Sequence, residues 1–349
     1  MLERSTSFEN VPLNHLRGGK NRRCPRYQGR AVVVGSVLIA LILFFSLIVP
    51  DVEAAGKLKV VTTVAPITNI VKNIGGDRIE LHGIVPEGTD SHTFEPAPSD
   101  IKYLAQADLL IFNGLTLEVP TEALANANKK KTAKVLKLGD NTIGKKEWVF
   151  DFSFPESEGN PNPHLWLSVA HSMRYAELIR DALTSLDPEG KAYYEKRAAE
   201  YLARLKKLDE AIFKVMETIP AKNRKLLTYH DSWAYFCPRY GCTVIGAVQP
   251  SSFSEPSPRE MARLIDQLKA EKVPAIFGSE VFPSKILDQI GKEAGVKFVS
   301  TLRDDDLPGP ADAPEHTFLG MMVENVQTMA SVLGGKGDAL NGIDVRNLQ

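Results

Sequence analysis

The sequence predicts an α/β protein of two lobes, each with a parallel sheet of about four strands covered by helices. Short apolar segments alternate with helical patterns along residues 55–187 and again along residues 219–349. Such alternation is typical of parallel sheets with both faces buried. Between these stretches, residues 188–218 carry one unbroken helical pattern, which predicts a long rigid helix that joins the lobes.

The elements of the first lobe follow its apolar segments. Strands are predicted at 59–64, 80–85, 109–112 and 134–138, and helices at 67–74, 99–107 and 168–186. Pairs of turn-forming residues end two of them, since Gly75-Gly76 follows the first helix and Asn113-Gly114 follows the third strand. Residues 139–163 are polar and contain Pro, Gly and Asn, so they predict a long loop.

The joining helix is predicted from Glu189 to Thr218 by apolar residues spaced three or four positions apart. A helix of about 30 residues spans roughly 45 Å, which suits a spine shared by two lobes better than a single core. The apolar positions are Tyr194, Ala198, Tyr201, Leu205, Leu208, Ile212 and Val215.

The second lobe repeats the rhythm of the first. Strands are predicted at 226–229, 243–248, 275–278 and 298–301, and helices at 231–240, 257–270, 284–294 and 317–333. Ser257 and Glu260 have the spacing of a capping box, with Pro258 at the first helical position. Ligands of parallel sheets bind beyond the carboxyl ends of the strands, so we expect the site in the crevice between the lobes.

Residues 1–54 have the pattern of a signal peptide or an N-terminal membrane anchor. Six basic residues lie between Arg17 and Arg30, and an uncharged apolar run covers residues 31–49. This run is longer than the roughly 7–15 residues of most signal peptides and approaches the roughly 20 that span a bilayer, so cleavage and tethering both stay open. Either way, the positive-inside rule predicts that the rest of the chain is exported to the periplasm or another extracytoplasmic space.

The composition gives no reason to expect a nucleic-acid partner, and it leaves open whether two cysteines form a disulfide. The net charge of −1 provides no electrostatic case for nucleic acid. Cys237 and Cys242 are the cysteines that remain after export. They are either two buried thiols or a disulfide that closes a short loop, and we expect no metal role for them.

Three histidines lie where loops meet the ends of predicted elements. His92 is in the loop after the second strand, His164 precedes a helix, and His230 directly follows a strand of the second lobe. These are equivalent positions at the rim of the expected crevice, which favours convergence on one shared metal ion. His82 and His171 lie within predicted elements and are expected to have ordinary structural roles.

Three imidazoles leave a divalent ion one ligand short of a tetrahedron. The run from Asp304 to Asp306 also lies just past a predicted strand and is the best source of a carboxylate ligand. Glu280 ends another strand, and we expect it to accept a hydrogen bond that orients a histidine or holds the lobes in register.

Around these histidines the chain resembles the zinc/manganese class of solute-binding proteins of ABC importers. The resemblance is carried by Asp90–Asp100, by Asn162–Leu167 and by Tyr229–Phe236, which leads to Gly241. It covers nearly the whole mature chain and implies two α/β lobes on a single long helix.

The same resemblance implies the ligand set. It makes His92, His164 and His230 metal ligands. It also implies an aspartate as the fourth ligand, which aligns with Asp305 and has Asp304 as the near alternative.

In this class the third ligand is often His in zinc carriers and Glu in manganese carriers, because imidazole suits zinc and carboxylate oxygen suits manganese. His230 therefore favours Zn²⁺, with Mn²⁺ or Fe²⁺ as the alternative. Many zinc members carry a His-rich loop before the second ligand, and here residues 139–163 contain no histidine.

The expected partner is an ABC permease in the cytoplasmic membrane, and we expect the chain itself to be a monomer. Two other functions stay open at this point. A metal-binding surface adhesin would keep the same site. A metallohydrolase would need an open zinc position and a general base, but the sequence has no His-Glu-x-x-His pattern, and we expect no enzyme.

Overall fold

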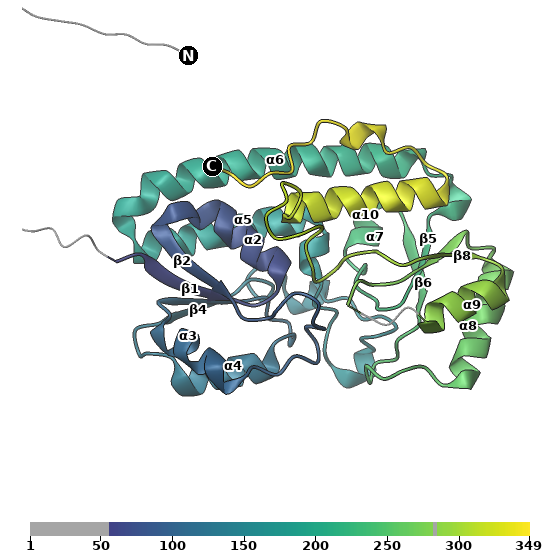
Figure 1. Cartoon of the computed structure of the whole chain (residues 1–349), viewed down its shortest axis with the longest axis horizontal. Helices are drawn as coiled ribbons and strands as arrows, with labels where there is room; N and C mark the ends of the chain where they lie inside the picture. The colour runs from purple at the N-terminus through teal and green to yellow at the C-terminus, as the bar shows by residue number, and fades with distance from the viewer. Residues whose placement is uncertain (1–55, 282–284) are drawn as a thin grey trace, which may run out of the picture. The chain divides into compact units, whose positions relative to one another are not determined.

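Each half of the chain contains one parallel four-stranded sheet, as predicted (Figure 1). The computed structural model describes residues 56–281 and 285–349. The predicted signal peptide or anchor therefore lies outside the described residues. Within those two ranges, no helix is long and apolar enough to cross a membrane.

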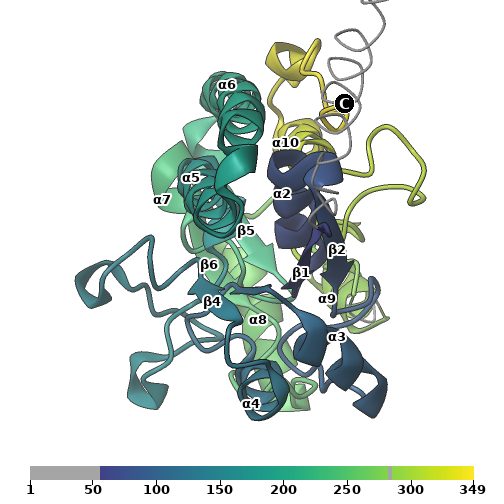
Figure 2. The same ribbon diagram turned by 90° about the vertical axis from the view of Figure 1, so that its left-hand side faces the viewer.

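The first sheet has the strand order β2-β1-β3-β4, and all its strands are parallel. Its strands are β1 (Leu58–Thr62), β2 (Ile79–Gly83), β3 (Leu109–Phe112) and β4 (Lys134–Lys137). Successive side chains point to opposite sides, and helices pack on both faces of the sheet. Val60, Leu109 and Ile111 pack toward helices α2 (Ala65–Gly75) and α5 (Val169–Leu186). Val61 and Leu110 pack toward α3 (Ile101–Gln106) and α4 (Val119–Asn128), on the opposite side of the sheet in Figure 2.

The second sheet repeats this order as β6-β5-β7-β8, again with all strands parallel. Its strands are β5 (Lys225–Thr228), β6 (Thr243–Ala247), β7 (Ala275–Phe277) and β8 (Lys297–Val299). Leu227 and Ile276 pack against α8 (Pro258–Glu271) and α9 (Lys285–Ala294), and the opposite face packs toward α10 (Phe318–Leu333). The predicted capping box is present at the start of α8, where the Ser257 N–H donates to Glu260 at 2.8 Å.

The long helix α6 (Lys191–Thr218) runs along both lobes (Figure 1). All seven apolar positions that predicted it are buried, and they pack against α2, α5 and α10. Its start differs by two residues from the prediction, since Pro188–Gly190 form a separate 3-10 turn that the Asp187 side chain caps. Its 28 residues correspond to about 42 Å. The lobe boundaries at residues 187 and 218 stay predictions.

The prediction missed one helix and gave another the wrong extent. Helix α4 was missed because only Thr121 and Ala125 on it are buried, so it has no apolar stripe. The helix predicted at 231–240 is limited to α7 (Phe236–Tyr240). Its first residues are not helical, and the Asp231 carbonyl accepts a hydrogen bond from the Asn162 side chain at 2.6 Å.

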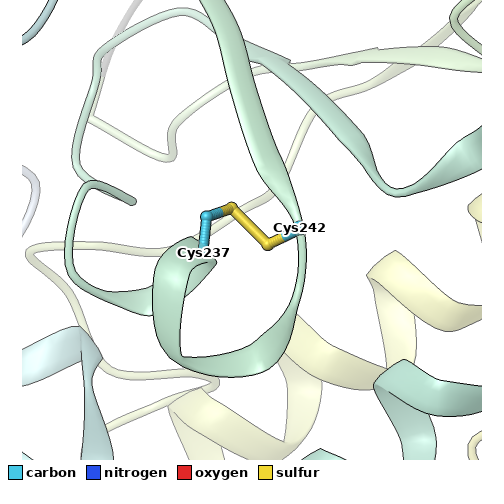
Figure 3. The surroundings of a disulfide bond; sticks show 2 residues. All are labelled: Cys237 and Cys242. Atoms are coloured by element: carbon cyan, nitrogen blue, oxygen red, sulfur yellow. A yellow bond between two sulfur atoms is a disulfide. The ribbon is translucent and has the colours of Figure 1, made fainter. Parts of the chain in front are cut away.

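The two exported cysteines form a disulfide (Figure 3). Cys237 lies in α7 and Cys242 lies just before β6, with their Cα atoms 4.5 Å apart. Gly241 makes the turn between them at φ +77°, a conformation that glycine adopts at little cost. Of the two alternatives that the sequence left open, the structure has the disulfide.

Candidate metal centre

The three predicted histidines converge on one point between the lobes. His92 comes from the loop after β2, His164 from the loop before α5, and His230 from just beyond β5. The Nε2 atom of His164 lies 3.1 Å from that of His92 and 3.2 Å from that of His230. Within the described part of the chain, they are the only group of three or more His, Cys, Asp or Glu residues that could hold a metal ion, and their ligand atoms all lie within 4.8 Å of one another.

His164 is held by the side chain two residues before it. The Asn162 amide oxygen lies 2.8 Å from Nδ1 of His164 and also accepts the His164 backbone N–H at 2.9 Å. The Asn162 amide nitrogen donates to Asp151 at 2.7 Å and to the Asp231 carbonyl, so its orientation is fixed. An amide oxygen can only accept, so Nδ1 carries the proton and the Nε2 lone pair faces the centre.

His230 is held in the same way by the second lobe. The Gln249 amide oxygen lies 2.8 Å from Nδ1 of His230, and Gln249 is buried just past β6. Thr228 donates its hydroxyl to the His230 carbonyl at 2.7 Å, which fixes the backbone at the strand end. Two of the three imidazoles are therefore oriented by amide oxygens from different loops.

Burial keeps the three imidazoles neutral. It lowers the pKa of His92 and of His164 well below the usual value, and the neighbouring imidazoles lower both further. Burial lowers the pKa of His230 to about 4. Because only neutral imidazole has a lone pair to give, the site is in its metal-binding protonation state near neutral pH.

Glu280 shapes the aspartate loop within its own lobe. Its Oε1 atom accepts the backbone N–H groups of Asp304, Asp305 and Asp306 at 3.2, 3.1 and 2.8 Å. The structure thus places Glu280 as a support for this loop, whereas Asn162 and Gln249 orient two of the histidines.

Of the three adjacent aspartates 304–306, only Asp305 has a buried carboxylate oxygen without a hydrogen-bond partner. Its Oδ2 accepts the backbone N–H of Ser91, next to His92, at 3.2 Å, while its buried Oδ1 has no hydrogen-bond partner. The Asp304 carboxylate instead accepts from Ser279 at 2.9 Å. A buried unpaired carboxylate oxygen is costly unless a cation meets it. Asp305 lies outside the close group of the three histidines, so its role as fourth ligand stays a prediction.

Burial disfavours the charged form of two carboxyl groups in and under the aspartate loop. Burial, reinforced by the charge of Asp304, raises the pKa of Glu280 to about 8 and raises the pKa of Asp305 well above its usual range. A divalent cation next to these groups would offset the cost of ionising them.

The comparison with known proteins agrees with this geometry. Residues 60–332 match the family model described as "Zinc-uptake complex component A periplasmic". The chain belongs to this family. The family is described as periplasmic, and this confirms the predicted export.

Similar proteins of this family are named as transport components. The chain is 31% identical over 285 residues to the metal ABC transporter substrate-binding lipoprotein FimA of Streptococcus parasanguinis, covering 80% of this chain and 90% of the relative. It is 30% identical over 286 residues to the manganese ABC transporter substrate-binding lipoprotein PsaA of Streptococcus pneumoniae, with the same coverage. These names confirm the prediction that the chain belongs to the substrate-binding proteins of metal ABC importers.

Solved structures agree on the fold. The periplasmic zinc-binding protein TroA of Treponema pallidum matches with a TM-score of 0.73 and 29% identity, covering 80% of this chain and 99% of TroA. The manganese-bound periplasmic metal-binding protein of Candidatus Liberibacter asiaticus matches with a TM-score of 0.70 and 27% identity, covering 79% of this chain and 100% of that chain.

In this member of the zinc-uptake family, several hydrogen bonds join the lobes around the histidines. Gly88 N–H donates to Asp306 at 2.6 Å, and the Trp166 indole N–H donates to the Asp304 carbonyl at 2.8 Å. Ser153 donates its hydroxyl to the Gln249 carbonyl at 3.2 Å. Movement of one lobe away from the other would break these bonds together.

Four residues that bound the centre were not predicted as functional. Asn162 and Gln249 orient histidines, and the rings of Phe154 and Phe253 lie beside them. Gln249 follows a predicted strand, so the rule that placed His230 also points to it. The two phenylalanines sit in irregular loops, and no sequence pattern indicates their position.

Proposed function

We propose that the chain captures one zinc ion between its lobes, through His92, His164, His230 and Asp305, and delivers it to an ABC permease. The observation that carries this proposal is the convergence of three neutral imidazoles with their Nε2 atoms toward one another. The free Oδ1 of Asp305 supports a carboxylate as the fourth ligand.

The ligand types favour zinc over manganese. Imidazole nitrogen binds zinc well, whereas manganese prefers oxygen ligands, and this centre offers three nitrogens to one carboxylate. Relatives are named for each metal, PsaA for manganese and TroA for zinc. Mn²⁺ and Fe²⁺ remain the second candidates.

The small cavity beside the centre suits a metal ion better than an organic substrate of an enzyme. The cavity beside His92 has a volume of about 100 Å³, whereas pockets for organic substrates hold roughly 300–1,000 Å³. Its walls include the rings of Phe154 and Phe253. We therefore propose a carrier without catalytic activity of its own.

Calorimetric titration of the purified protein with zinc, in competition with a chelator, tests the proposal. We expect one ion per chain in the tight class and at least a 100-fold weaker affinity in His230→Ala. His82→Ala is the matched control, because that ring stacks on Tyr103 at 3.6 Å instead of joining the centre. Tight binding of several ions, or unchanged affinity in His230→Ala, would contradict the site.

Competition among zinc, manganese and iron(II) in the same titration decides the metal. Delivery is tested in cells that lack the protein, where zinc accumulation should be restored by the wild-type chain and not by His164→Ala. Restoration by both would show that uptake does not depend on this centre.

A further inference from the structure

Two aromatic rings cover the candidate centre. The Phe154 ring lies within reach of all three imidazoles, with centroids 5.4 Å from His92, 5.8 Å from His164 and 5.7 Å from His230. The Phe253 ring comes from the second lobe and lies parallel to His92, with centroids 5.0 Å apart and planes at 14°. Phe253 also meets Phe154 edge-on at 5.9 Å. The stacked pair of Phe253 and His92 therefore bridges the two lobes.

The backbone of Phe253 is strained in the position that aims its ring at His92. Its φ of +55° is in the left-handed region, which is uncommon for a bulky residue. Its N–H donates to the Pro250 carbonyl at 2.9 Å, and its carbonyl accepts from the Gln249 amide at 3.4 Å. Gln249 is also the residue that holds His230. Such strained residues persist where the surroundings hold them in place, often at ligand clamps.

The rings stand at a small cavity that reaches the centre on one side. This cavity has a volume of about 100 Å³. It is lined by His92, which is one of the predicted metal ligands, and by Phe154 and Phe253. Exposed Glu158 and Asn160 line it as well. An ion that enters this cavity from solvent therefore has both the Glu158 carboxylate and the His92 imidazole in the wall around it, and the Phe253 ring lies against that imidazole.

We propose that Phe253 is the gate of the metal centre and sets the rate of ion exchange. The ring covers His92 while stacked, and it must leave this position before an ion enters or leaves by the cavity. Gate opening precedes both capture and release, so the gate changes both rates and leaves the equilibrium affinity nearly unchanged. This inference rests on the proposed function, because it concerns the passage of the ion that the centre holds.

Stopped-flow measurements on the purified protein test the gate with zinc itself. Association is followed with a zinc indicator, and dissociation is followed after adding excess chelator. Phe253→Gly and Phe253→Asn remove the ring, and both residues tolerate positive φ, so the backbone keeps its conformation. Phe152→Ala is the matched control, because this aromatic residue of the Phe154 loop is 54% exposed.

We expect both rates to rise about tenfold in the two Phe253 variants, since a stacked aromatic contact is worth about that factor. The dissociation constant should stay within about threefold of wild type, and Phe152→Ala should match wild type in both rates. Unchanged rates in the Phe253 variants would overturn the gate. Faster dissociation with unchanged association would also overturn it, because Phe253 would then only stabilise the bound form. Equilibrium titration separates these results from failure of the proposed function, which would appear as a wild-type protein that binds no zinc.

Discussion

Replacing Gln249 with methionine removes the acceptor that holds His230 while keeping the length of the side chain. The Gln249 oxygen lies 2.8 Å from Nδ1 of His230, and the residue is only 2% exposed, so water does not replace it. The variant removes this hydrogen bond from a buried imidazole, and the loss of a hydrogen bond to a buried group costs about 1–3 kcal/mol. It also frees the imidazole to rotate away from the direction in which Nε2 faces the centre.

The effect on zinc affinity follows from this lost bond. Hydrogen bonds from outer residues to metal-bound histidines are worth about 10–100-fold in affinity. This range corresponds to about 1.4–2.7 kcal/mol of binding free energy. We expect the zinc dissociation constant of Gln249→Met to rise within that range, with one ion per chain retained.

Chelator-competition titration measures this change directly. Gln267→Met is the matched control. The Gln267 amide donates to the Ile245 carbonyl at 2.6 Å, and no hydrogen bond joins Gln267 to the three histidines. An affinity within threefold of wild type in Gln249→Met would refute the orienting role. An equal loss in Gln267→Met would show that the effect is general destabilisation of the lobe.

Three further predictions concern the metal, the disulfide and a buried carboxyl group. His230→Glu should shift the zinc-to-manganese affinity ratio toward manganese by at least tenfold in a competition titration, since it exchanges nitrogen for oxygen; an unchanged ratio would contradict the assignment of His230. Reduction of the Cys237–Cys242 disulfide should lower the free energy of unfolding by about 2 kcal/mol, given its short loop, as measured by denaturant unfolding with and without reductant. Burial raises the pKa of Glu118 from 4.5 to about 7, so between these values the folded chain holds a proton that the unfolded chain has lost. Stability should therefore fall by about 3 kcal/mol as pH rises from 4.5 to 7, and urea unfolding at several pH values should show a flatter profile in Glu118→Gln.

The fold and the three histidines were predictable because both follow from local patterns. Apolar strand segments and the spacing of buried residues on α6 indicate the elements. The rule that parallel strands present their carboxyl ends at one edge then brings the following loops together. His230 illustrates this, since it lies two residues beyond β5 and its ring faces the centre.

The rest depends on contacts between segments far apart in the chain. The first residues of the predicted helix at 231–240 are not helical, and their Asp231 carbonyl is bound by Asn162. Which of three adjacent aspartates has a free oxygen depends on the bonds that Ser279 and Ser91 make to them. The place of Phe253 is set by a backbone conformation that its residue type disfavours.

The stiffness of α6 limits how this protein can release its cargo. No Gly or Pro interrupts the helix from Lys191 to Thr218, and helices kink chiefly at such residues. Because α6 is continuous and packs against helices of both lobes, it resists a change in the angle between the two sheets. A hinge of extended strands would allow such a change more readily. Release then depends on the loops that carry the ligands and rings, which open at lower cost than packed helices do. The proposed permease would therefore act on those loops to release the ion. We expect it to bind where these loops are exposed.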